Sequence, residues 1–520
     1  MASGPEAVFA AGAAALEAGD FRAAEQLFQQ IVDRYPRAHM AWNALAVVAL
    51  RAGFPDVAAE HAKRALELDR RNPVYLNTLG VVHGELGGFA EAEQAFRRAL
   101  KARPAYAEGH FNLGKALHKL GRLDEALRAF ERAYAIDAEF PGVRASLCAM
   151  YRKHGRAERA MAVLRAAPGG LEASDEFSPL VAETLEELEG APGAVAWLRQ
   201  VIGRHADWYA ARYTLGKLLL SLGEWHEGWR EYLWRPHLLP ERSARAPAPL
   251  PPRLNAMRVL VRGEQGLGDA LFFLRFVDEL RRRGAEASLA VPRRLAAVLG
   301  SAGGCEVLAE EDAPAARFDH AIWGGDLPAL LETAAVPPAF ALERDAARAA
   351  RCRRRLAELG PAPYLALTWR AGTDVLMTQE FGRERGLQSK EIPPAALGAA
   401  LRGWRGTLFS VQRQARAGEA EALAAAAGAA LHDLSALNDD LPEILAMLSV
   451  AEEYVCVSNT NVHLLAGIGR GARVLVPYPA EWRWMREGGS PWFPGCSMYR
   501  EPQERGWEKP LLDLRKDLFS

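Results

Sequence analysis

The first half of the chain repeats itself every 34 residues, and this period constrains the fold more than any other feature. Three columns of residues share it. An apolar column holds Ala11, Leu45, Leu79, Leu113, Leu147, Val181 and Leu215, the small residues Gly12, Ala46, Gly80, Gly114, Cys148, Ala182 and Gly216 follow it directly, and Ala24, Ala58, Ala92, Ala126, Ala160, Ala194 and Gly228 stand twelve places further on. One period in three independent columns predicts a stack of similar units, each packed on its neighbours.

The period and the small residues resemble the tetratricopeptide repeat, which has two helices per unit and small side chains where the helices cross. We therefore predict an all-α solenoid of about seven repeats over residues 1–235. A larger side chain, such as Phe96 or Phe130, is expected to fill the gap left by the glycine of its own repeat. Such arrays bind other chains, so a protein partner is expected.

Composition places the chain among ordinary soluble proteins of several domains. It has 520 residues, half of them hydrophobic, and a formal net charge of −1, which gives no indication of nucleic acid or an anionic membrane as partner. The five cysteines are scattered and form no C-x-x-C pair, so neither a disulfide framework nor a metal site is expected. No apolar run is long enough to span a membrane, and a reducing, cytoplasmic location is expected.

The second half has a different design, beginning after a linker at 236–256 that contains six prolines. Short apolar strands alternate with helical segments over 257–345 and again over 361–505, and a tail covers 506–520. The expected strands are 258–262, 287–291 and 318–323 in the first stretch, and 364–369, 407–411, 431–434, 454–457 and 473–476 in the second. This alternation predicts two parallel α/β sheets in tandem, with a ligand held by loops at the strand ends.

The first candidate loop, Gly263–Asp269, follows the first expected strand. It does not match a P-loop because Asp269 stands where the phosphate-binding lysine belongs, and Leu271 replaces the last glycine of a dinucleotide fingerprint. A carboxylate at the start of a helix stays ionised and suits a general base that accepts a proton from a hydroxyl. Aspartate is also a favoured N-cap, so a purely structural role stays open. Supporting loop residues are Gln265, Gly266 and Gly268.

The second candidate loop, Ser458–Gly467, follows the strand expected at 454–457. Small hydroxyl and amide residues open a helix there, so free backbone N–H groups face the strand end and suit a phosphate group. The candidate ligand contacts are Ser458, Asn459, Thr460 and Asn461. His463 lies early in the helix and reaches either the same ligand or a neighbouring carbonyl, as a packed histidine would.

The C-terminal half resembles the heptosyltransferase-related glycosyltransferases of family 9, in the bacterial subgroup that carries N-terminal tetratricopeptide repeats. The resemblance spans roughly residues 257 to 505. It is carried by Gly268–Asp269, by Lys390 within 389–393, by Ser458–Gly467 and by Glu481–Trp484. It implies the GT-B fold, in which two Rossmann-like halves face a nucleotide-sugar cleft.

The resemblance also implies roles. Asp269 is the candidate base that deprotonates the acceptor, and Lys390 neutralises the donor phosphates, with Thr460, Asn461 and the helix start holding the diphosphate. Thr373 is a further candidate donor contact. The family usually has an aspartate before this threonine, whereas this chain has Asn459, whose neutral amide cannot supply that charge. No D-x-D motif is present, so metal-independent chemistry with a nucleotide-sugar co-substrate and no further cofactor is expected.

Two groups of residues have alternative interpretations. The aromatic residues Tyr478, Trp482, Trp484, Trp492 and Phe493 either stack on a base or sugar or pack the C-terminal segment on the core. The asparagines Asn43, Asn77 and Asn112 are expected on the concave face of the solenoid. They form either a short ladder for an acceptor chain, like the longer one in protein O-GlcNAc transferase, or ordinary surface polarity.

Together these features predict a glycosyltransferase that moves a sugar from a nucleotide donor to a protein acceptor recruited by the repeats. Bacterial fusions of this kind modify flagellin or surface proteins, which indicates the class of acceptor but not its identity. A glycan or lipid-linked acceptor is an alternative. A non-catalytic scaffold with a degenerate transferase domain is another, although the retention of Asp269 and Lys390 favours the enzyme.

Overall fold

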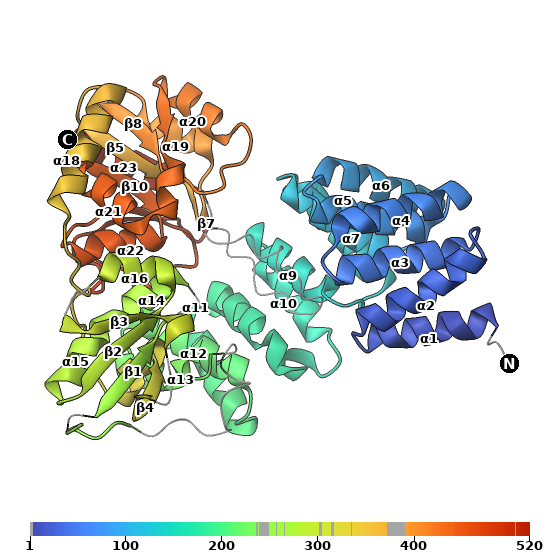
Figure 1. The fold of residues 1–520 in the computed structure, drawn as a ribbon, viewed down its shortest axis with the longest axis horizontal. Helices are drawn as coiled ribbons and strands as arrows, with labels where there is room; N and C mark the ends of the chain where they lie inside the picture. Colours follow the sequence, from blue (N-terminus) through green and yellow to red (C-terminus); the bar gives the residue numbers. More distant parts are fainter. Residues whose placement is uncertain are drawn as a thin grey trace. The chain divides into compact units, whose positions relative to one another are not determined.

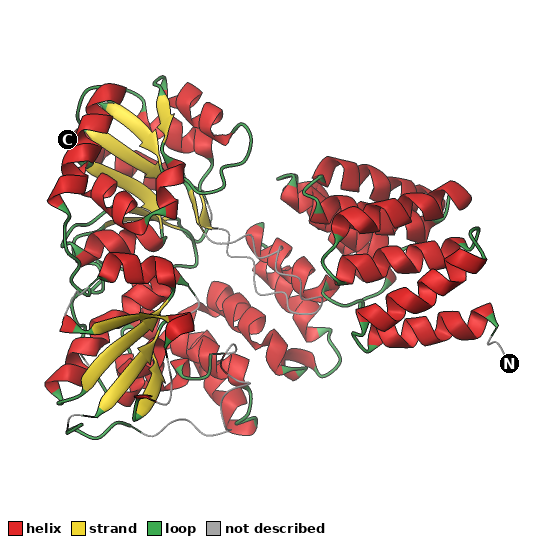
Figure 2. Cartoon of the chain, in the orientation of Figure 1, coloured by secondary structure: helices red, strands yellow, loops and turns green. Residues whose placement is uncertain are grey.

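A computed structural model describes residues 4–235, 238, 249–255, 257–264, 266–300, 304–313, 317–333, 335–371, 390–504 and 506–520. Gln265, Thr373 and most of the linker expected at 236–256 lie outside these ranges. The described residues up to Ala167 form one compact unit, and those from Pro168 onward form a second. All strands of the described chain belong to the second unit (Figure 2).

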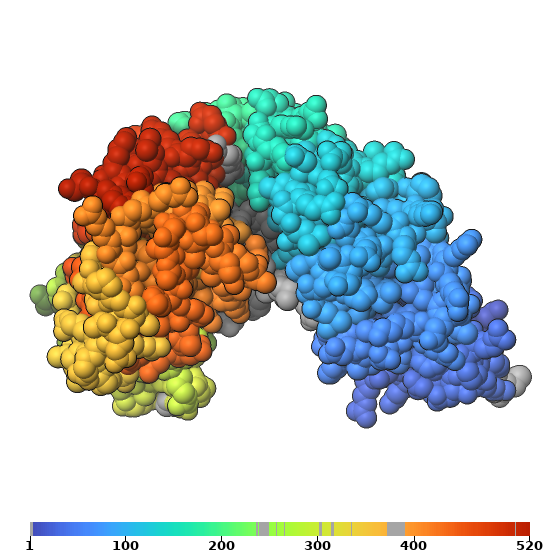
Figure 3. Space-filling model, turned by 90° about the horizontal axis from the view of Figure 1, so that it is seen from above, coloured from blue at the N-terminus to red at the C-terminus, as the bar shows by residue number. Residues whose placement is uncertain are grey.

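The first unit is a row of helical hairpins, coloured blue to teal in Figure 1. Its helices are α1 (Pro5–Glu17), α2 (Phe21–Arg34), α3 (His39–Arg51), α4 (Pro55–Leu68), α5 (Pro73–Glu85), α6 (Phe89–Ala102), α7 (Ala107–Lys119), α8 (Leu123–Ile136), α9 (Val143–Lys153) and α10 (Ala157–Arg165). Consecutive hairpins stack on one another, so colour changes smoothly along the row in the space-filling view (Figure 3). The predicted solenoid is confirmed for these repeats.

Glycine permits the close crossing of the two helices in a hairpin. A Cβ added to Gly80 on α5 would lie 2.4 Å from Cε1 of Phe96 on α6, and one added to Gly114 on α7 would lie 2.8 Å from Cε1 of Phe130 on α8. Real Cβ atoms do not approach other atoms so closely, so any larger residue would push the helices apart. The pairing of glycine and phenylalanine that the sequence predicts is therefore the packing contact within a repeat.

Helical hairpins continue at the start of the second unit. It begins with two short 3-10 turns, η1 (Gly170–Glu172) and η2 (Asp175–Phe177), followed by α11 (Ser178–Arg204), α12 (Tyr209–Leu222) and α13 (Trp225–Tyr232). α11 is two helices joined across Gly190, whose φ of 78° breaks the regular backbone. This segment therefore supplies two further helix pairs, and the second of them, α12 and α13, leads to the α/β part.

The first sheet contains β1 (Arg258–Arg262), β2 (Glu286–Val291), β3 (Glu306–Ala309) and β4 (His320–Trp323). All neighbours run parallel in the order β3-β2-β1-β4. The connections and flanks are α14 (Leu267–Phe273), η4 (Leu274–Phe276), α15 (Val277–Arg282), α16 (Arg293–Leu299), η6 (Glu310–Asp312), η8 (Gly324–Asp326) and α17 (Leu327–Leu330). Three short helical pieces, α14, η4 and α15, therefore follow β1.

The second sheet contains β5 (Tyr364–Thr368), β8 (Thr407–Ser410), β9 (Leu431–Asp433), β10 (Glu453–Val457), β11 (Arg473–Val476) and β12 (Ser497–Arg500). Its parallel order is β12-β11-β10-β5-β8-β9. Its helical elements are α18 (Ala346–Leu359), α19 (Pro394–Leu401), α20 (Glu419–Ala427), η10 (Ser435–Asp439), α21 (Leu441–Val450), α22 (Thr460–Gly467), η11 (Trp482–Trp484) and α23 (Glu508–Phe519). A short antiparallel pair, β6 (Arg370–Ala371) and β7 (Lys390–Glu391), lies beside it.

Helices cover both faces of the second sheet. Leu365 and Leu367 on β5 pack in one core with residues of α19, α20 and α23, whereas Ala366 between them packs in the other core with residues of α18, α21 and α22. Alternate residues of a strand point to opposite faces, so burial on both sides requires a continuous apolar run. The sequence has such runs, and the predicted parallel α/β architecture is confirmed.

Trp229 of α13 joins the last helix pair to both sheets' domains. Its ring lies edge-on to Phe276, with centroids 5.9 Å apart, and to Trp482 and Trp492, at 5.3 and 5.8 Å. Trp482, Trp484, Trp492 and Phe493 are each at most 4% exposed. These four aromatic residues therefore pack this core, as one of the two interpretations expects, whereas Tyr478 is half-buried and stays open to either interpretation.

The hairpin contact can be tested within a single helix. Replacing Gly80 of α5 by alanine should destabilise the protein by roughly 1–3 kcal/mol because the new methyl group collides with Phe96. Replacing Gly84, one turn along the same helix, should instead stabilise by roughly 0.5–1 kcal/mol, since nothing lies within 4 Å of its added Cβ. Urea denaturation of the two variants and the native protein measures the change in the free energy of unfolding for each. Equal changes in the two variants would contradict the contact between Gly80 and Phe96.

Candidate functional site

The strand order of the second sheet defines a crevice between β5 and β10. The chain leaves β5 toward β8 and β9, but leaves β10 in the opposite direction, toward β11 and β12. Loops that leave adjacent strands in opposite directions open a crevice at the carboxyl end of a doubly wound sheet, and ligands bind there. The segment Ser458–Asn461 follows β10 at this point, and Trp369–Arg370 follows β5. The second candidate loop therefore lies at the switch point.

Asn459 caps α22. Its Oδ1 accepts a hydrogen bond from the backbone N–H of Asn461 at 2.9 Å, and its Nδ2 donates to Val457 O at 2.9 Å and to the Tyr454 hydroxyl at 2.9 Å. An aspartate could keep the first contact and could accept from the Tyr454 hydroxyl, which also lies 3.2 Å from Asn459 Oδ1, but it has no N–H for Val457 O. Both polar atoms of the Asn459 side chain are therefore hydrogen-bonded within the protein, and the residue has a structural role.

The residues on either side of the cap differ in what they can offer a ligand. Ser458 and Asn461 are 7% and 6% exposed, and the Asn461 amide donates to Asn438 Oδ1 at 3.3 Å. Thr460 is partly exposed as the first residue of α22. The N–H groups of a first helical turn lack partners within the helix, but Asn461 N–H and Val462 N–H donate to Asn459. Thr460, with its own N–H and hydroxyl, therefore forms the accessible anion-binding part of the loop.

Asp269 lies in the first turn of α14, which begins at Leu267 and has Gly266 as its N-cap. The alternative interpretation of Asp269 as the N-cap is therefore wrong, because the helix begins two residues earlier than that interpretation requires. Its side chain is 48% exposed, and its Oδ1 accepts a hydrogen bond from Arg483 Nη2. A half-exposed carboxylate held at one oxygen is accessible to an incoming hydroxyl.

A continuous chain of charges connects Asp269 to the second candidate loop. Arg483 pairs with Asp269 through Nη2 and with Glu481 through Nη1. Glu481 Oε2 in turn lies 3.6 Å from Lys390 Nζ and accepts a hydrogen bond from Ser458 Oγ at 3.3 Å. The structure therefore brings together Asp269, Lys390 and Ser458, which come from three distant parts of the sequence.

The charges in this chain stabilise one another. Burial by itself would raise the pKa of Glu481, but Arg483 and Lys390 outweigh it and lower the pKa to about 2. Burial likewise opposes the charge on Arg483, yet Glu481 and Asp269 raise its pKa further above the ordinary arginine value. Both groups are therefore charged near neutral pH, and removing one partner would leave a buried charge unpaired.

His463 lies where the starts of α14 and α22 meet. A Cβ added to Gly268 would lie 3.3 Å from His463 Cδ2 and 3.6 Å from Thr460 Cα. Burial, together with the positive charges of Arg483 and Arg275, lowers the pKa of His463 well below 6.5. The imidazole is therefore neutral near pH 7, so it can contact a ligand through hydrogen bonds but cannot neutralise a phosphate.

The asparagines predicted for the concave face of the repeats belong to the first unit. Asn77 is 3% exposed, donates to Glu108 Oε1 at 3.1 Å and accepts from Asn112 Nδ2 at 3.1 Å. Asn43 keeps its Oδ1 buried without a hydrogen bond from any described residue. Asn77 and Asn112 are thus brought together, but in a network that already uses the Asn77 amide.

Three residues of this network were not predicted as site residues from the sequence: Arg483, Glu481 and Arg275. Arg275 is 3% exposed and lies with its guanidinium carbon 4.1 Å from the centre of the Phe272 ring. Burial and the neighbouring Arg483 lower its pKa to about 9. The only sequence signal for this group was the resemblance carried by Glu481–Trp484, because the contacts themselves join residues up to 217 positions apart.

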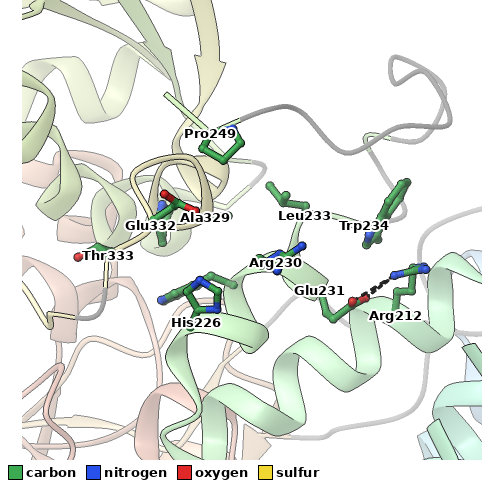
Figure 4. Close-up of a pocket in the computed structure, with 12 residues that line it drawn as sticks. Arg212, His226, Arg230, Glu231, Leu233, Trp234, Pro249, Ala329, Glu332 and Thr333 are labelled. Atoms are coloured by element: carbon green, nitrogen blue, oxygen red, sulfur yellow. Dashed lines mark hydrogen bonds and ion pairs between the residues drawn. The ribbon is translucent and has the colours of Figure 1, made fainter. Parts of the chain in front are cut away.

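A separate pocket of about 420 Å³ lies between α13 and α17, away from this network (Figure 4). Arg212 and Glu231 on its wall form an ion pair at 3.0 Å. Within the described ranges, no group of three or more His, Cys, Asp or Glu side chains is arranged to hold a metal ion. No helix in the same ranges is both long and apolar enough to cross a membrane.

The neutral state of His463 has a measurable consequence for stability. The unfolded chain takes up a proton near pH 6.5 whereas the folded chain does not, so the contribution of His463 is complete above pH 6.5 and is lost as the pH falls below it. Between pH 7.5 and pH 5.5 one such group weakens folding by about 1.4 kcal/mol. Glu481 does not interfere, because its contribution is lost only as the pH falls from about 4.5 toward 2.

Urea denaturation at the two pH values, for the native protein and for His463→Asn, measures this difference. The variant should be less stable at pH 7.5 but should lose about 1.4 kcal/mol less than the native protein on acidification. An identical loss in both proteins would show that His463 is protonated in the folded state.

Models of the tetratricopeptide repeat match residues 9–73, 77–142 and 119–182. Protein FlbA of Caulobacter vibrioides is 26% identical over 543 residues, which cover 96% of this chain and 87% of that protein. Tetratricopeptide repeat protein 6 of Homo sapiens is 26% identical over 121 residues, or 23% of each chain.

Among solved structures, a thermophilic TPR protein of Thermus thermophilus is 22% identical with a TM-score of 0.31 and covers 35% of this chain and 97% of its own. Pseudomonas aeruginosa pilF is 21% identical with a TM-score of 0.34 and covers 39% of this chain and 92% of its own. The repeat models establish that residues 9–182 contain tetratricopeptide repeats, a module that mediates protein–protein interactions.

Proposed function

We propose that the α/β part is a glycosyltransferase of the GT-B class, which transfers a sugar from a nucleotide donor to an acceptor. The observation that carries this proposal is the charge chain from Asp269 through Arg483 and Glu481 to Lys390. It links a carboxylate beside the first sheet to the ligand crevice of the second. An enzyme that joins an acceptor to a donor needs a base on one side and an anion site on the other.

Asp269 is the proposed base. Arg483 Nη2 donates a hydrogen bond to its Oδ1, while no hydrogen bond to its Oδ2 is found among the described residues. Oδ2 would accept the proton from the acceptor hydroxyl as the oxygen attacks the anomeric carbon and the bond from that carbon to the diphosphate breaks. The sugar thus moves to the acceptor oxygen and the nucleoside diphosphate leaves.

The departing diphosphate would be held by Lys390, by the Thr460 hydroxyl and by the free N–H groups that open α22, whereas the buried Ser458 hydroxyl donates to Glu481. Lys390 is 30% exposed and lies near Glu481, so it can turn toward a ligand without leaving an isolated charge behind. Helix N–H groups and a lysine stabilise negative charge that develops in a transition state. His463 would contribute a hydrogen bond from its neutral ring.

The asparagine at 459 is compatible with this activity. Its side chain is committed to capping α22 and to supporting the end of β10, so it orients the N–H groups that would meet the phosphates. The missing negative charge would affect the choice of donor rather than the architecture of the crevice. This argues against the non-catalytic scaffold, which was the second candidate function.

The repeats of the first unit would recruit the acceptor, which we propose is a protein. Tetratricopeptide repeats bind polypeptide chains, and this array occupies a large share of the molecule. A flagellin or a surface protein is the class of acceptor that the family resemblance implies. A glycan or lipid-linked acceptor would use the same base and donor site but would not need the array for recognition.

Calorimetry of the full chain against UDP, GDP, ADP, CMP and dTDP and their sugars tests the donor site. One nucleotide should bind with micromolar affinity, and Lys390→Ala should weaken it at least tenfold, because a charge-assisted contact to phosphate is lost. Lys509→Ala, which removes an exposed lysine of α23, serves as the matched control and should bind normally. If no nucleotide binds, the scaffold interpretation replaces the transferase.

The same preparation tests the base. Asp269→Asn should bind the donor normally but should turn it over 10²–10⁴-fold more slowly, the usual range for loss of a general base. Release of nucleoside diphosphate from the donor, in the presence of cell extract as a source of acceptor, measures turnover. Unchanged turnover in this variant would remove Asp269 from the mechanism.

A further inference from the structure

Arg235, just after α13, lies buried among the loops of the first sheet. Its side chain is 1% exposed, and its Nη2 lies 3.2 Å from Glu264 Oε1 and 2.5 Å from Asp326 Oδ1. Its Nη1 donates to the carbonyl oxygens of Tyr232 at 3.2 Å and Gly325 at 3.1 Å. One guanidinium thus connects the end of the last repeat to two loops of the α/β part.

These two loops mark the switch point of the first sheet. Glu264 follows β1 and Asp326 lies in η8 after β4, and β1 and β4 are neighbours where the strand order reverses. In doubly wound sheets this is where a ligand binds. Here the crevice contains the protein's own arginine and two carboxylates.

The backbone at Gly325 packs directly against the Arg235 guanidinium and the Glu264 carboxylate. A Cβ added to Gly325 would lie 2.6 Å from Glu264 Oε1 and 3.0 Å from Arg235 Cζ, so only glycine fits. The Gly325 N–H donates to Glu264 Oε1 at 2.8 Å. A charge buried this deeply is costly unless it is paired, and two carboxylates and two carbonyl oxygens pair the Nη atoms of Arg235, whereas its Nε has no hydrogen-bond partner among the described residues.

Glu264 belongs to the loop that carries Asp269 into α14. We infer that Arg235 is a positioning residue that fixes this loop and thereby the Asp269 carboxylate, which makes the last repeat a part of the transferase rather than of the recruiting array. This inference rests on the proposed function for the role of Asp269. It also assigns the nucleotide to the second sheet alone, because the switch point of the first is filled.

The Arg235→Lys variant tests the inference in the full chain. Lysine keeps the positive charge but cannot reach two carboxylates and two carbonyls at once. Backbone amides over 263–273 should exchange hydrogen at least tenfold faster, and donor turnover should fall at least tenfold. Affinity for the tightest-binding nucleoside diphosphate of the calorimetric panel should stay within twofold, because that site lies on the second sheet.

Arg212→Lys is the matched control. Arg212 lies on α12 of the same repeat and pairs with Glu231 of α13, so the substitution disturbs the repeat without touching a loop of the sheet. It should leave exchange over 263–273 and donor turnover unchanged. Should Arg235→Lys not fold, Glu264→Gln tests the same contact, since it keeps the shape and the bond from Gly325 while removing the charge.

Unchanged exchange over 263–273 in the Arg235 and Glu264 variants would overturn the inference. Equal losses of nucleotide affinity and turnover would also overturn it, because they would indicate general damage to the α/β part. If the native protein turns over no donor at all, the proposed function fails instead. The exchange measurement then still decides whether Arg235 fixes the loop.

Discussion

The arrangement of the candidate site depends on one guanidinium, that of Arg483. It is 7% exposed, pairs with Asp269 beside the first sheet and with Glu481 beside the second, and lies 4.6 Å from the centre of the Phe272 ring. A buried charge without partners is very costly, so the fold is stable only when Arg483 lies next to its carboxylate partners. This requirement couples the position of the proposed base to that of the proposed phosphate site.

The last helix pair, α12 and α13, also holds the two sheets' domains together. Trp229 packs against aromatic residues from both sheets' domains, and Arg486 of the second domain hydrogen bonds to Ser221 of α12 at 2.9 Å. Arg235 adds the buried contact to the loops of the first sheet. Helical hairpins of the repeat type therefore have a second use in this chain. The last pair, α12 and α13, packs against the α/β part and supports it.

Much of the fold could be predicted from sequence because helices, hairpins and buried strands each follow from patterns within a short stretch of residues. The 34-residue period predicts the hairpins, and apolar runs predict the central strands such as β1, β5 and β10. The sequence analysis did not predict β3 and β12, whose partly exposed residues give a weak apolar signal. Their position at a sheet edge is not the whole reason, because the other two edge strands, β4 and β9, coincide with the segments predicted at 318–323 and 431–434.

The site could be predicted only in part, for a related reason. Capping residues and loop positions identified Asp269 and the Ser458–Asn461 segment, since these depend on a strand end followed by a helix start. The partners that define their chemistry are distant in sequence, as with Arg483 and Asp269, which are 214 positions apart. No local pattern specifies such a pair. Gln265 and Thr373 stay predictions, because they lie outside the described residues.

The most direct test is an experimental structure of the full chain with the nucleoside diphosphate that it binds. We expect the diphosphate at the carboxyl ends of β5 and β10, against the start of α22 and Lys390, with Arg235 still paired to Glu264 and Asp326. A nucleotide in the crevice between β1 and β4, or in the pocket between α13 and α17, would contradict the assignment of the donor site.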